Sequence, residues 1–334
     1  KTAGNLEVHF IDVGQGDATL IKCDGHSMLI DAGNNDKGTL VQNYLQHQGV
    51  ETLDYVIGTH PDADHIGGMD VVLYKFDCKT IIMPDVANNT RTYDDVVQTM
   101  KNKGYKTTYP VVGETYTIGG AAFTIIAPNK EYGNDMNSWS VGVLLQNGNH
   151  RFLFTGDAEE GAEQDILQNG IDISADVYKV AHHGSNTATS QAFLDAVHPT
   201  YAVISAGEGN SYGHPHAEVL NRLRAAGVSV FRTDEQGTIV ASSDGTTLTW
   251  NMSPSESWQA GEAKKSQNTE KSEKAADSQN NAETDAAISN PTDQTDGNSD
   301  VIVHITKTGE KYHSAGCQYL RKSDIEVTLS EAKA

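Results

Sequence analysis

The sequence predicts an α/β domain in which mixed β-sheets are flanked by helices. From Leu6 to Trp250, apolar extended runs alternate with amphipathic stretches. One pair of runs meets at Asn147-Gly148, a favoured two-residue hairpin turn, so some neighbouring strands are antiparallel. Other runs are separated by helical stretches, which is typical of parallel crossovers. Hairpins and crossovers together indicate mixed sheets rather than one all-parallel sheet.

The predicted strands are short runs rich in β-branched and aromatic residues, bounded by turn residues. In chain order they cover residues 6–13, 18–23, 27–33, 54–60, 80–84, 123–128, 140–157 (a hairpin), 176–183, 201–207, 228–234 and 238–243. The predicted helices carry apolar residues at helical spacing, and four of them are followed by a glycine suited to a left-handed C-cap. They cover residues 38–48, 66–75, 92–103, 158–169, 190–197 and 215–226.

Composition divides the 334 residues into three zones. Residues 1–252 form the large domain. Residues 253–299 are rich in Ser, Gln, Asn, Glu, Lys, Asp and Ala, with little to bury, and this composition predicts a disordered linker. Residues 300–334 regain strand-like alternation and form a small C-terminal module. Its His313 and Cys317 supply only half of a four-ligand zinc site, so we expect a structural module.

Charge and cysteine content limit the classes of function. The chain has 24 basic and 45 acidic residues, a formal net charge of -21, so an anionic substrate requires a local positive site. No apolar run approaches the ~18 residues of a membrane helix. Cys23, Cys78 and Cys317 allow at most one disulfide. The chain begins at Lys1 without a methionine, and we expect an exported protein whose signal peptide has been removed.

The segment THPDADH, residues 59–65, crowds four potential metal ligands into six positions. It follows the apolar run DYVIG, so the ligands emerge from the end of a buried strand. Carboxylates this close repel each other unless positive charge lies among them, and a metal supplies it. His60 and Asp62 are spaced to face one ion, and Asp64 and His65 a second.

THPDADH resembles the His-x-His-x-Asp-His signature of the metallo-β-lactamase superfamily. Asp62 stands at the second histidine position, as in the ComEC-type branch and the related phosphorylcholine esterases. FIDVGQGDATLI, LIDAG, FLFTGDAE, DVYKVAHHGS and YGHPH also match that branch in order, over roughly residues 6–250. The resemblance implies the fold of this superfamily, a four-layer αββα sandwich of two mixed β-sheets.

The resemblance also implies the remaining metal ligands. Asp157, at the end of FLFTGD, takes the position of a carboxylate that bridges two metals. One histidine of the pair His182 and His183 is expected to complete the first site beside His60 and Asp62. The two are not separable by sequence, although the esterase pattern favours His183.

His214 is expected to complete the second site with Asp64, His65 and Asp157. The aspartates Asp62, Asp64 and Asp157 bring three negative charges against four from two divalent ions. Two divalent metal ions are therefore expected, with zinc the first choice and manganese compatible with the carboxylate-rich ligands.

The sequence departs from the commonest superfamily pattern at one ligand. The histidine usual between the first motif and the bridging aspartate is missing, and residues 134–140 offer only Asn137 and Ser138 there. The tandem His182-His183 is a candidate replacement.

The candidate catalytic side chains are Asp64, Lys179 and His216. Lys179 lies in an apolar strand and either contacts a substrate phosphate or is an edge-strand lysine that reaches solvent. His216 either hydrogen-bonds the substrate or stands in the first turn of a helix. Asp17, in the turn GQGDA, either supports a metal ligand from behind or belongs only to a glycine-rich turn.

These observations predict an exported dinuclear metal-dependent hydrolase that uses a metal-bound hydroxide on phosphodiester bonds. The substrate would be DNA or an envelope-polymer headgroup, as for the nuclease-like and phosphorylcholine esterase-like members of the branch. Two alternatives are a lactone, thioester or β-lactam hydrolase and a non-enzymatic cell-surface binding protein. The expected location is extracellular or cell-envelope-associated, in a Gram-positive-like envelope, with the C-terminal module as the attachment.

Overall fold

The computed structural model describes residues 3–262 and three short strands near the C-terminus. The chain forms two compact units, Lys1–Asn268 and Thr269–Ala334. The second unit contains an antiparallel sheet in the order β17-β16-β18, formed by β16 (Ile302–Ile305), β17 (Tyr312–His313) and β18 (Ile325–Thr328). Cys317 and most of the predicted linker lie outside the described residues.

The first sheet of the large unit has eight strands in the order β15-β14-β1-β2-β3-β4-β5-β6. Strands β3, β4, β5 and β6 are parallel to one another, and the other pairings are antiparallel. The strands are β1 (Leu6–Phe10), β2 (Thr19–Cys23), β3 (His26–Ile30), β4 (Thr52–Ile57), β5 (Asp77–Ile82), β6 (Thr107–Thr108), β14 (Ile239–Ser243) and β15 (Leu248–Trp250).

The second sheet has seven strands in the order β13-β12-β11-β10-β9-β8-β7. Strands β10 to β13 are parallel, and β7 to β10 are antiparallel, with the predicted hairpin turn between β9 and β10. The strands are β7 (Thr115–Ile118), β8 (Ala121–Ala127), β9 (Gly142–Asn147), β10 (His150–Phe154), β11 (Val177–Lys179), β12 (Tyr201–Ile204) and β13 (Ser229–Arg232).

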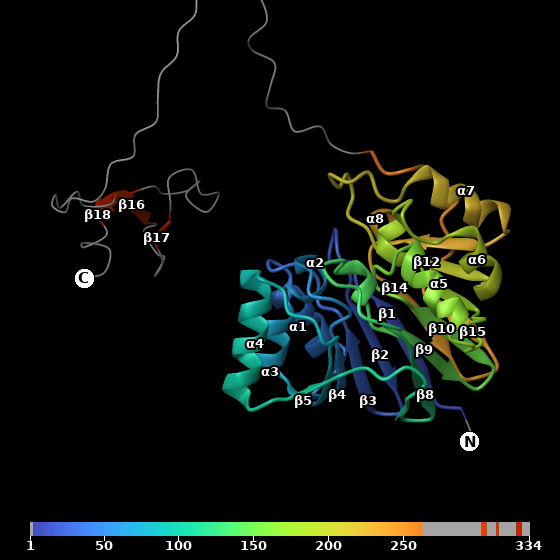
Figure 1. The fold of residues 1–334 in the computed structure, drawn as a ribbon, viewed down its shortest axis with the longest axis horizontal. Helices are drawn as coiled ribbons and strands as arrows, with labels where there is room; N and C mark the ends of the chain where they lie inside the picture. Colours follow the sequence, from blue (N-terminus) through green and yellow to red (C-terminus); the bar gives the residue numbers. More distant parts are fainter. Residues whose placement is uncertain (1–2, 263–301, 306–311, 314–324, 329–334) are drawn as a thin grey trace, which may run out of the picture. The chain divides into compact units, whose positions relative to one another are not determined.

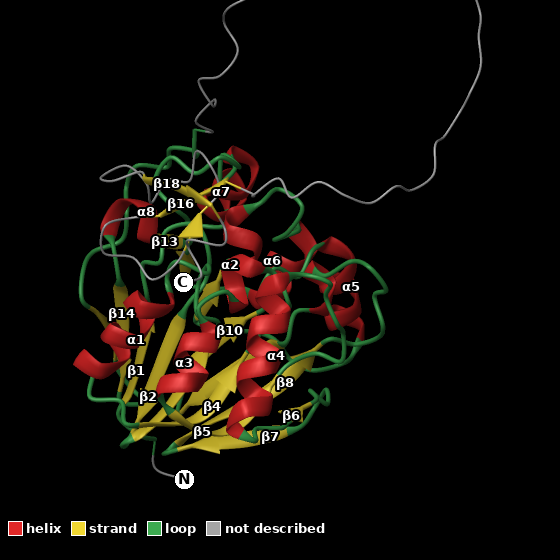
Figure 2. Cartoon of the chain, turned by 90° about the vertical axis from the view of Figure 1, so that its left-hand side faces the viewer, coloured by secondary structure: helices red, strands yellow, loops and turns green. Residues whose placement is uncertain are grey.

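Helices cover the outer faces of both sheets. Their bounds are α1 (Gly38–His47), α2 (Ala63–Ile66), α3 (Met69–Lys75), α4 (Arg91–Lys103), α5 (Glu160–Gln168), α6 (Gln191–Val197), α7 (Ala217–Ala225) and α8 (Thr233–Gln236). Helices α1, α3 and α4 lie against the first sheet, and α5, α6 and α7 against the second (Figures 1 and 2). A third apolar cluster fills the space between the sheets, around side chains such as Phe10, Phe123 and Phe152. The predicted αββα sandwich of two mixed sheets is therefore confirmed.

The region predicted as one helix over residues 66–75 is divided into α2 and α3 by Gly67-Gly68. A Cβ at Gly67 would lie 2.6 Å from the carbonyl carbon of Asn34, and a Cβ at Gly68 would lie 2.8 Å from the Cα of Gly38. Only glycine permits this close backbone approach. It brings α2, with its two ligand-type residues, against the loop that follows β3.

Residues 253–262, which we expected to begin the linker, belong to the large unit and make hydrogen bonds to the rest of it. The Ser255 amide donates to the Val230 carbonyl at 2.7 Å, and the Gly261 amide donates to the Pro215 carbonyl at 2.9 Å. Trp258 packs against the apolar cluster beneath α5, α6 and α7. The ordered chain of the large unit thus continues past residue 252.

Candidate metal centre

The ligand-type residues meet where parallel strands of both sheets end. His60 to His65 follow β4, Asp157 follows β10, His182 and His183 follow β11, and the loop with His214 follows β12. Carboxyl ends of parallel strands lie at the same edge of a sheet, where such folds commonly bind ligands. Residues up to about 150 positions apart in sequence therefore share one site.

The imidazole rings of His60 and His65 are held from behind by hydrogen bonds. His60 Nδ1 lies 3.1 Å from Thr59 Oγ1 and 3.3 Å from Ser140 Oγ. His65 Nδ1 lies 2.7 Å from Asp31 Oδ2, and that carboxylate also accepts the Thr59 amide at 2.8 Å. Because each Nδ1 is engaged, Nε2 of both rings is left to face the site.

His182 and His183 are oriented by an unusual backbone turn at the end of β11. Both residues have left-handed φ values, 49° and 53°. A non-glycine residue rarely adopts this conformation, and two in succession point to a functional constraint. His183 Nδ1 lies 3.0 Å from the Ser205 carbonyl oxygen, which directs Nε2 toward Asp64 Oδ2 at 3.2 Å and Asp157 Oδ2 at 3.5 Å.

His183 is grouped with different partners from those predicted. The sequence placed it beside His60 and Asp62, but its Nε2 lies next to Asp64 and Asp157. His182 is more peripheral, with Nε2 3.6 Å from Asp157 Oδ2 and Nδ1 3.4 Å from Glu159 Oε1. Asp62 Oδ2 lies 3.7 Å from His60 Nε2, as the sequence spacing predicts for a shared ion.

Four buried ligand atoms that face this space make no hydrogen bond of good geometry among the described residues: Nε2 of His60, His65 and His183, and Oδ1 of Asp157. Two of them, His65 Nε2 and Asp157 Oδ1, lie only 3.1 Å apart. Buried polar atoms are rarely left without a partner. Donor atoms of His60, His65 and Asp157 lie within 4.8 Å of one another, and so do those of Asp64, His65 and His183. Imidazole and carboxylate donors at this spacing fit zinc or another divalent metal ion.

The turn that contains Asp17 supports the site from behind, as one of the two interpretations of the sequence predicted. The Asp17 amide donates to the Asp64 carbonyl oxygen at 3.0 Å. A Cβ at Gly16, whose φ is 144°, would collide with that same oxygen, so the close approach requires glycine. Asp17 Oδ1 also lies 3.6 Å from His183 Nδ1.

Lys179 is buried in a central strand, so its interpretation as an edge-strand lysine was wrong, while its contact with a substrate phosphate stays a prediction. Strand β11 lies between β10 and β12 rather than at an edge. The Lys179 side chain is buried and its Nζ lies 2.8 and 2.9 Å from the two carboxylate oxygens of Asp17. The Lys179–Asp17 pair is internal to the protein, and Asp17 connects it to the candidate site.

His216 is also engaged in a structural role rather than free to meet a substrate. Its Nδ1 accepts the Asn186 amide at 2.9 Å, and its Nε2 lies 3.2 Å from the Tyr212 carbonyl oxygen. The Nδ1 contact joins the loop after β11 to the loop after β12, and the Nε2 contact lies within the loop after β12. Its predicted catalytic role is not supported by this geometry.

His214 lies beside the cluster without joining it. Its ring centroid is 5.6 Å from that of His182 and 6.1 Å from that of His183. Its Nδ1 faces Gln15 Nε2 at 3.3 Å. Among the described residues it belongs to none of the close donor groups, and its predicted role at the second site stays a prediction.

Ser140 fills part of the space near the missing superfamily histidine. Its hydroxyl oxygen accepts the Asp157 amide at 3.0 Å and lies 3.3 Å from His60 Nδ1. The Asn137 side-chain amide instead donates to Glu159 Oε1 at 3.2 Å, and the Ser138 hydroxyl donates to Asp135 Oδ2 at 2.6 Å. Ser140, Glu159 and Asp31 are not among the site residues that the sequence predicts.

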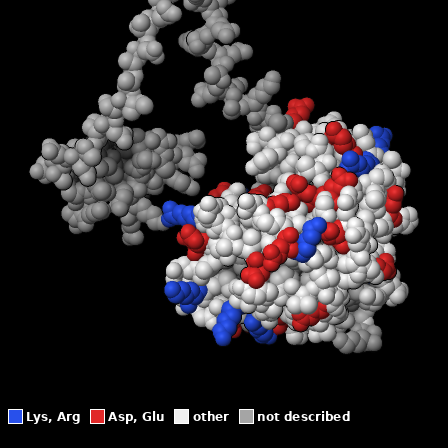
Figure 3. Space-filling model, viewed as in Figure 1, with Lys and Arg blue, Asp and Glu red and all other residues white. Residues whose placement is uncertain are grey.

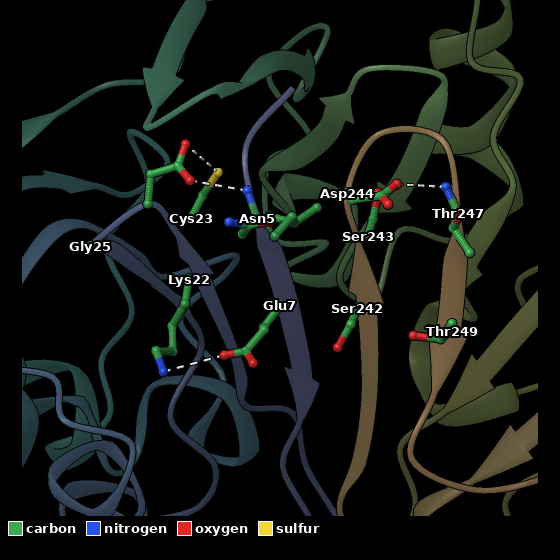
Figure 4. Close-up of a pocket in the computed structure, with 12 residues that line it drawn as sticks. Asn5, Glu7, Lys22, Cys23, Gly25, Ser242, Ser243, Asp244, Thr247 and Thr249 are labelled. Atoms are coloured by element: carbon green, nitrogen blue, oxygen red, sulfur yellow. Dashed lines mark hydrogen bonds and ion pairs between the residues drawn. The ribbon is translucent and has the colours of Figure 1, made fainter. Parts of the chain in front are cut away.

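A separate cavity of about 570 Å³ lies at the opposite end of β1 and β2 from Asp17. Figure 4 shows its polar lining, including the ion pair between Glu7 and Lys22 at 3.3 Å. No candidate metal ligand lines it. Among the described residues, no helix has the length and apolar character needed to span a membrane.

The sequence model that describes the metallo-β-lactamase superfamily matches residues 11–208, more than half of the 334-residue chain. The chain belongs to this superfamily. Membership implies a metal-dependent hydrolase, in agreement with the donor atoms gathered at the strand ends.

Three relatives confirm the ComEC-type competence branch of the superfamily. The chain is 31% identical to ComE operon protein 3 of Bacillus subtilis over 255 residues, and 33% identical to Recombination protein 2 of Haemophilus influenzae over 238 residues. It is 29% identical to Competence protein ComA of Neisseria gonorrhoeae over 230 residues. These alignments cover 70%, 70% and 68% of this chain but 32%, 28% and 31% of the relatives, so the chain spans about a third of their length.

The carboxylates of this metallo-β-lactamase site are balanced by protonated histidines when no metal is bound. Burial disfavours a charged His183, but Asp157 and then Asp17 raise its pKa to about 10. Burial likewise opposes a charged His65, whose pKa Asp157 and Asp31 raise well above its usual value. In contrast, burial and the charge of His65 lower the pKa of His60 to about 3. At neutral pH, His65 and His183 therefore each hold a proton that a metal must displace.

We expect metal binding to release about two protons per chain and to tighten as pH rises between about pH 6 and 8. The raised pKa values of His65 and His183 set this direction, since both rings must lose a proton before Nε2 can coordinate. Calorimetric titration with zinc in buffers of different ionisation enthalpy measures the released protons. An affinity that does not change with pH would contradict the assignment of these two rings.

We expect Asp31→Asn to weaken metal binding roughly 10- to 100-fold, because the anion that fixes the His65 ring is lost. Asp36→Asn, in the same loop with an exposed side chain, is the matched control and should bind metal like the parent. Competition with a zinc-sensitive chelating dye measures both. Equal affinity in the two variants would show that Asp31 does not position His65.

Proposed function

We propose that this chain hydrolyses phosphodiester bonds with two divalent metal ions held at the strand-end cluster. The observation that carries the proposal is the convergence of buried imidazole and carboxylate atoms: donor atoms of His60, His65 and Asp157 lie within 4.8 Å of one another, and so do those of Asp17, Asp157 and His183. Divalent ions bound there would polarise a phosphoryl oxygen and make water acidic enough to attack near neutral pH.

Some side chains of the cluster would bind the ions directly, and others position those ligands. Asp157 presents one carboxylate oxygen to His65, at 3.1 Å, and the other to His183, at 3.5 Å, so it lies between the two groups of donors. His60 and Asp62 extend the cluster on one side, and Asp64 extends it on the other. Four side chains orient these donors through contacts with the Nδ1 atoms of the histidine rings: Thr59 and Ser140 at His60, Asp31 at His65 and Asp17 at His183.

Three features favour a phosphodiester over an acyl substrate. Three of the candidate ligands are carboxylates, which make the site hard and compatible with manganese as well as zinc. A pair of ions can stabilise both the attacking and the leaving oxygen of a phosphoryl transfer. One relative is named Recombination protein 2, and recombination acts on nucleic acid.

The charge of the chain limits how such a substrate is bound. The net charge is -21, and Figure 3 shows carboxylates spread over the viewed face. A polyanion is therefore repelled at long range. We propose that binding depends on contacts at the metal centre itself and weakens little with added salt, unlike binding through a basic surface.

We also propose that the enzyme works outside the cytoplasm, in the medium or at the cell envelope. The motive is the second unit that follows the hydrolase in the chain. Labelling of intact cells that express the native gene, with a cytoplasmic enzyme as control, tests this location. Recovery of the protein only after lysis would overturn it.

A panel of substrates tests the proposed activity. Bis(p-nitrophenyl) phosphate, single-stranded DNA and a phosphorylcholine ester represent phosphodiesters; nitrocefin and a thioester represent the acyl alternative. We expect turnover of the first group that is lost with a chelator and restored by zinc or manganese. Metal-dependent turnover of only the acyl substrates would replace the proposal, and no turnover of any would favour the non-enzymatic alternative.

A further inference from the structure

We infer that residues 253–262, named the strap, position the loop of residues 207–216 beside the metal centre. This loop carries His214 and connects β12 to α7. The strap follows the last strand of the large unit, β15, and carries the chain toward the second unit. Its catalytic consequence rests on the proposed function, but its structural role does not.

The strap is attached at its beginning to β13 and α8. The Ser255 amide donates to the Val230 carbonyl at 2.7 Å. The hydroxyls of Ser255 and Ser257 each donate to the Glu235 carboxylate, at 2.5 Å. Three hydrogen bonds to two neighbouring elements fix the direction in which the strap leaves β15.

The middle of the strap is held by two arginines. Arg232 is buried, donates to the Gln259 carbonyl oxygen through Nη1, and is itself paired with Asp234. The guanidinium of Arg224, on α7, lies 5.7 Å from the centre of the half-buried Trp258 ring. A buried arginine and an aromatic anchor are strong attachments for a segment without helix or strand structure.

The end of the strap lies directly on the backbone of the loop. The Gly261 amide donates to the Pro215 carbonyl at 2.9 Å. A Cβ at Gly261 would collide with the His214 carbonyl oxygen and would lie 2.8 Å from the carbonyl carbon of Gly213. Because no side chain fits between the two backbones, the strap limits how far the His214 peptide can move outward.

Hydrogen bonds connect this loop to the residues around the candidate metal centre. Asn210 Nδ2 donates to the same His214 carbonyl oxygen at 2.6 Å, and Gln15 joins the His214 ring to the Gly207 amide. The His216 amide donates to the Gly184 carbonyl, next to His183 in the chain, at 2.9 Å. A displaced strap would therefore loosen the loop on one side and the turn that contains His183 on the other.

Gly261→Ala in the full chain tests the inference, with Gly161→Ala as the matched control. A Cβ at Gly161, in α5, meets no atom within 4 Å. Hydrogen exchange followed by mass spectrometry reports on residues 207–216 without any need for activity. We expect exchange there to accelerate at least about 10-fold in Gly261→Ala and to stay at the parent rate in Gly161→Ala.

Kinetics give the catalytic consequence on bis(p-nitrophenyl) phosphate. We expect kcat to fall roughly 10- to 100-fold in Gly261→Ala while the thermal midpoint stays near that of the parent. Trp258→Ala provides a second variant if Gly261→Ala does not fold, with the same expected acceleration of exchange. Unchanged exchange at residues 207–216 in the variants that fold would overturn the inference. An inactive parent with accelerated exchange in the variants would instead contradict the proposed function alone.

Discussion

Asp157→Asn is expected to abolish metal-dependent turnover, with a loss of more than about 10³-fold in kcat/KM, beyond the loss typical of residues that only support ligands. The substitution keeps the shape of the side chain but removes the anion that lies 3.1 Å from His65 Nε2 and 3.5 Å from His183 Nε2. A neutral amide cannot balance the charge of two divalent ions. Bound metal per chain, measured by elemental analysis, should fall with the activity.

Asp195→Asn is the matched control for this variant. Asp195 is exposed on α6, and its carboxylate accepts from Gln191 at 2.7 Å. It should retain the metal content and the rate of the parent. If Asp157→Asn kept both as well, the carboxylate would not be a ligand and the proposed centre would be wrong.

Lys179→Met is expected to destabilise the protein by roughly 3–5 kcal/mol, because it leaves the buried Asp17 carboxylate without its partner. Asp17 is 5% exposed and Lys179 is 4% exposed, so solvent offers neither charge much compensation. Urea unfolding measures the free energy of unfolding. The turn containing Asp17 would also loosen behind Asp64 and His183, so a lower metal affinity should accompany the lost stability.

A double-mutant cycle separates this account from a role in substrate binding. Lys179→Met combined with Asp17→Asn removes both charges and should recover much of the lost stability, because no unpaired charge stays buried. A lysine that bound a substrate phosphate would instead raise KM and leave the free energy of unfolding near that of the parent. The second pattern would contradict the ion pair seen in the structure.

Much of the candidate metal centre was predictable because its potential ligands are concentrated in short motifs at strand ends. THPDADH follows β4, and TGD follows β10, so the sequence placed His60, His65 and Asp157 at the correct edge. The partner of His183 was not predictable, because it depends on how the second sheet packs against the first. The burial of Lys179 depends in the same way on the position of β11 within its sheet.

The residues missed from the sequence carry weaker local signals. Asp31 is a single aspartate after a strand, a pattern that is typical of ordinary turns, and its contact with His65 spans 34 residues. Strand β15 is short, and β7 has exposed threonines, so neither stands out as an apolar run. The strap has the composition of a linker, and its attachment depends on Arg232, Arg224 and a backbone contact at Gly261.

Protonated histidines can balance the clustered carboxylates without a metal. The sequence predicts that dense carboxylates require divalent ions, but raised pKa values allow His65 and His183 to supply positive charge in the metal-free protein. Charge balance alone therefore does not identify a metal centre. Geometry identifies the candidate centre better, because donor atoms of His60, His65 and Asp157 are buried within 4.8 Å of one another, and so are those of Asp17, Asp157 and His183.

Anomalous diffraction at the zinc edge, from crystals of the full chain grown with zinc, tests this central claim most directly. The account predicts two peaks at the cluster, one of them within about 2.0–2.3 Å of His183 Nε2, and both in reach of Asp157. Crystals with no peak among His60, Asp64, His65, Asp157 and His183, despite zinc in the solution, would contradict it.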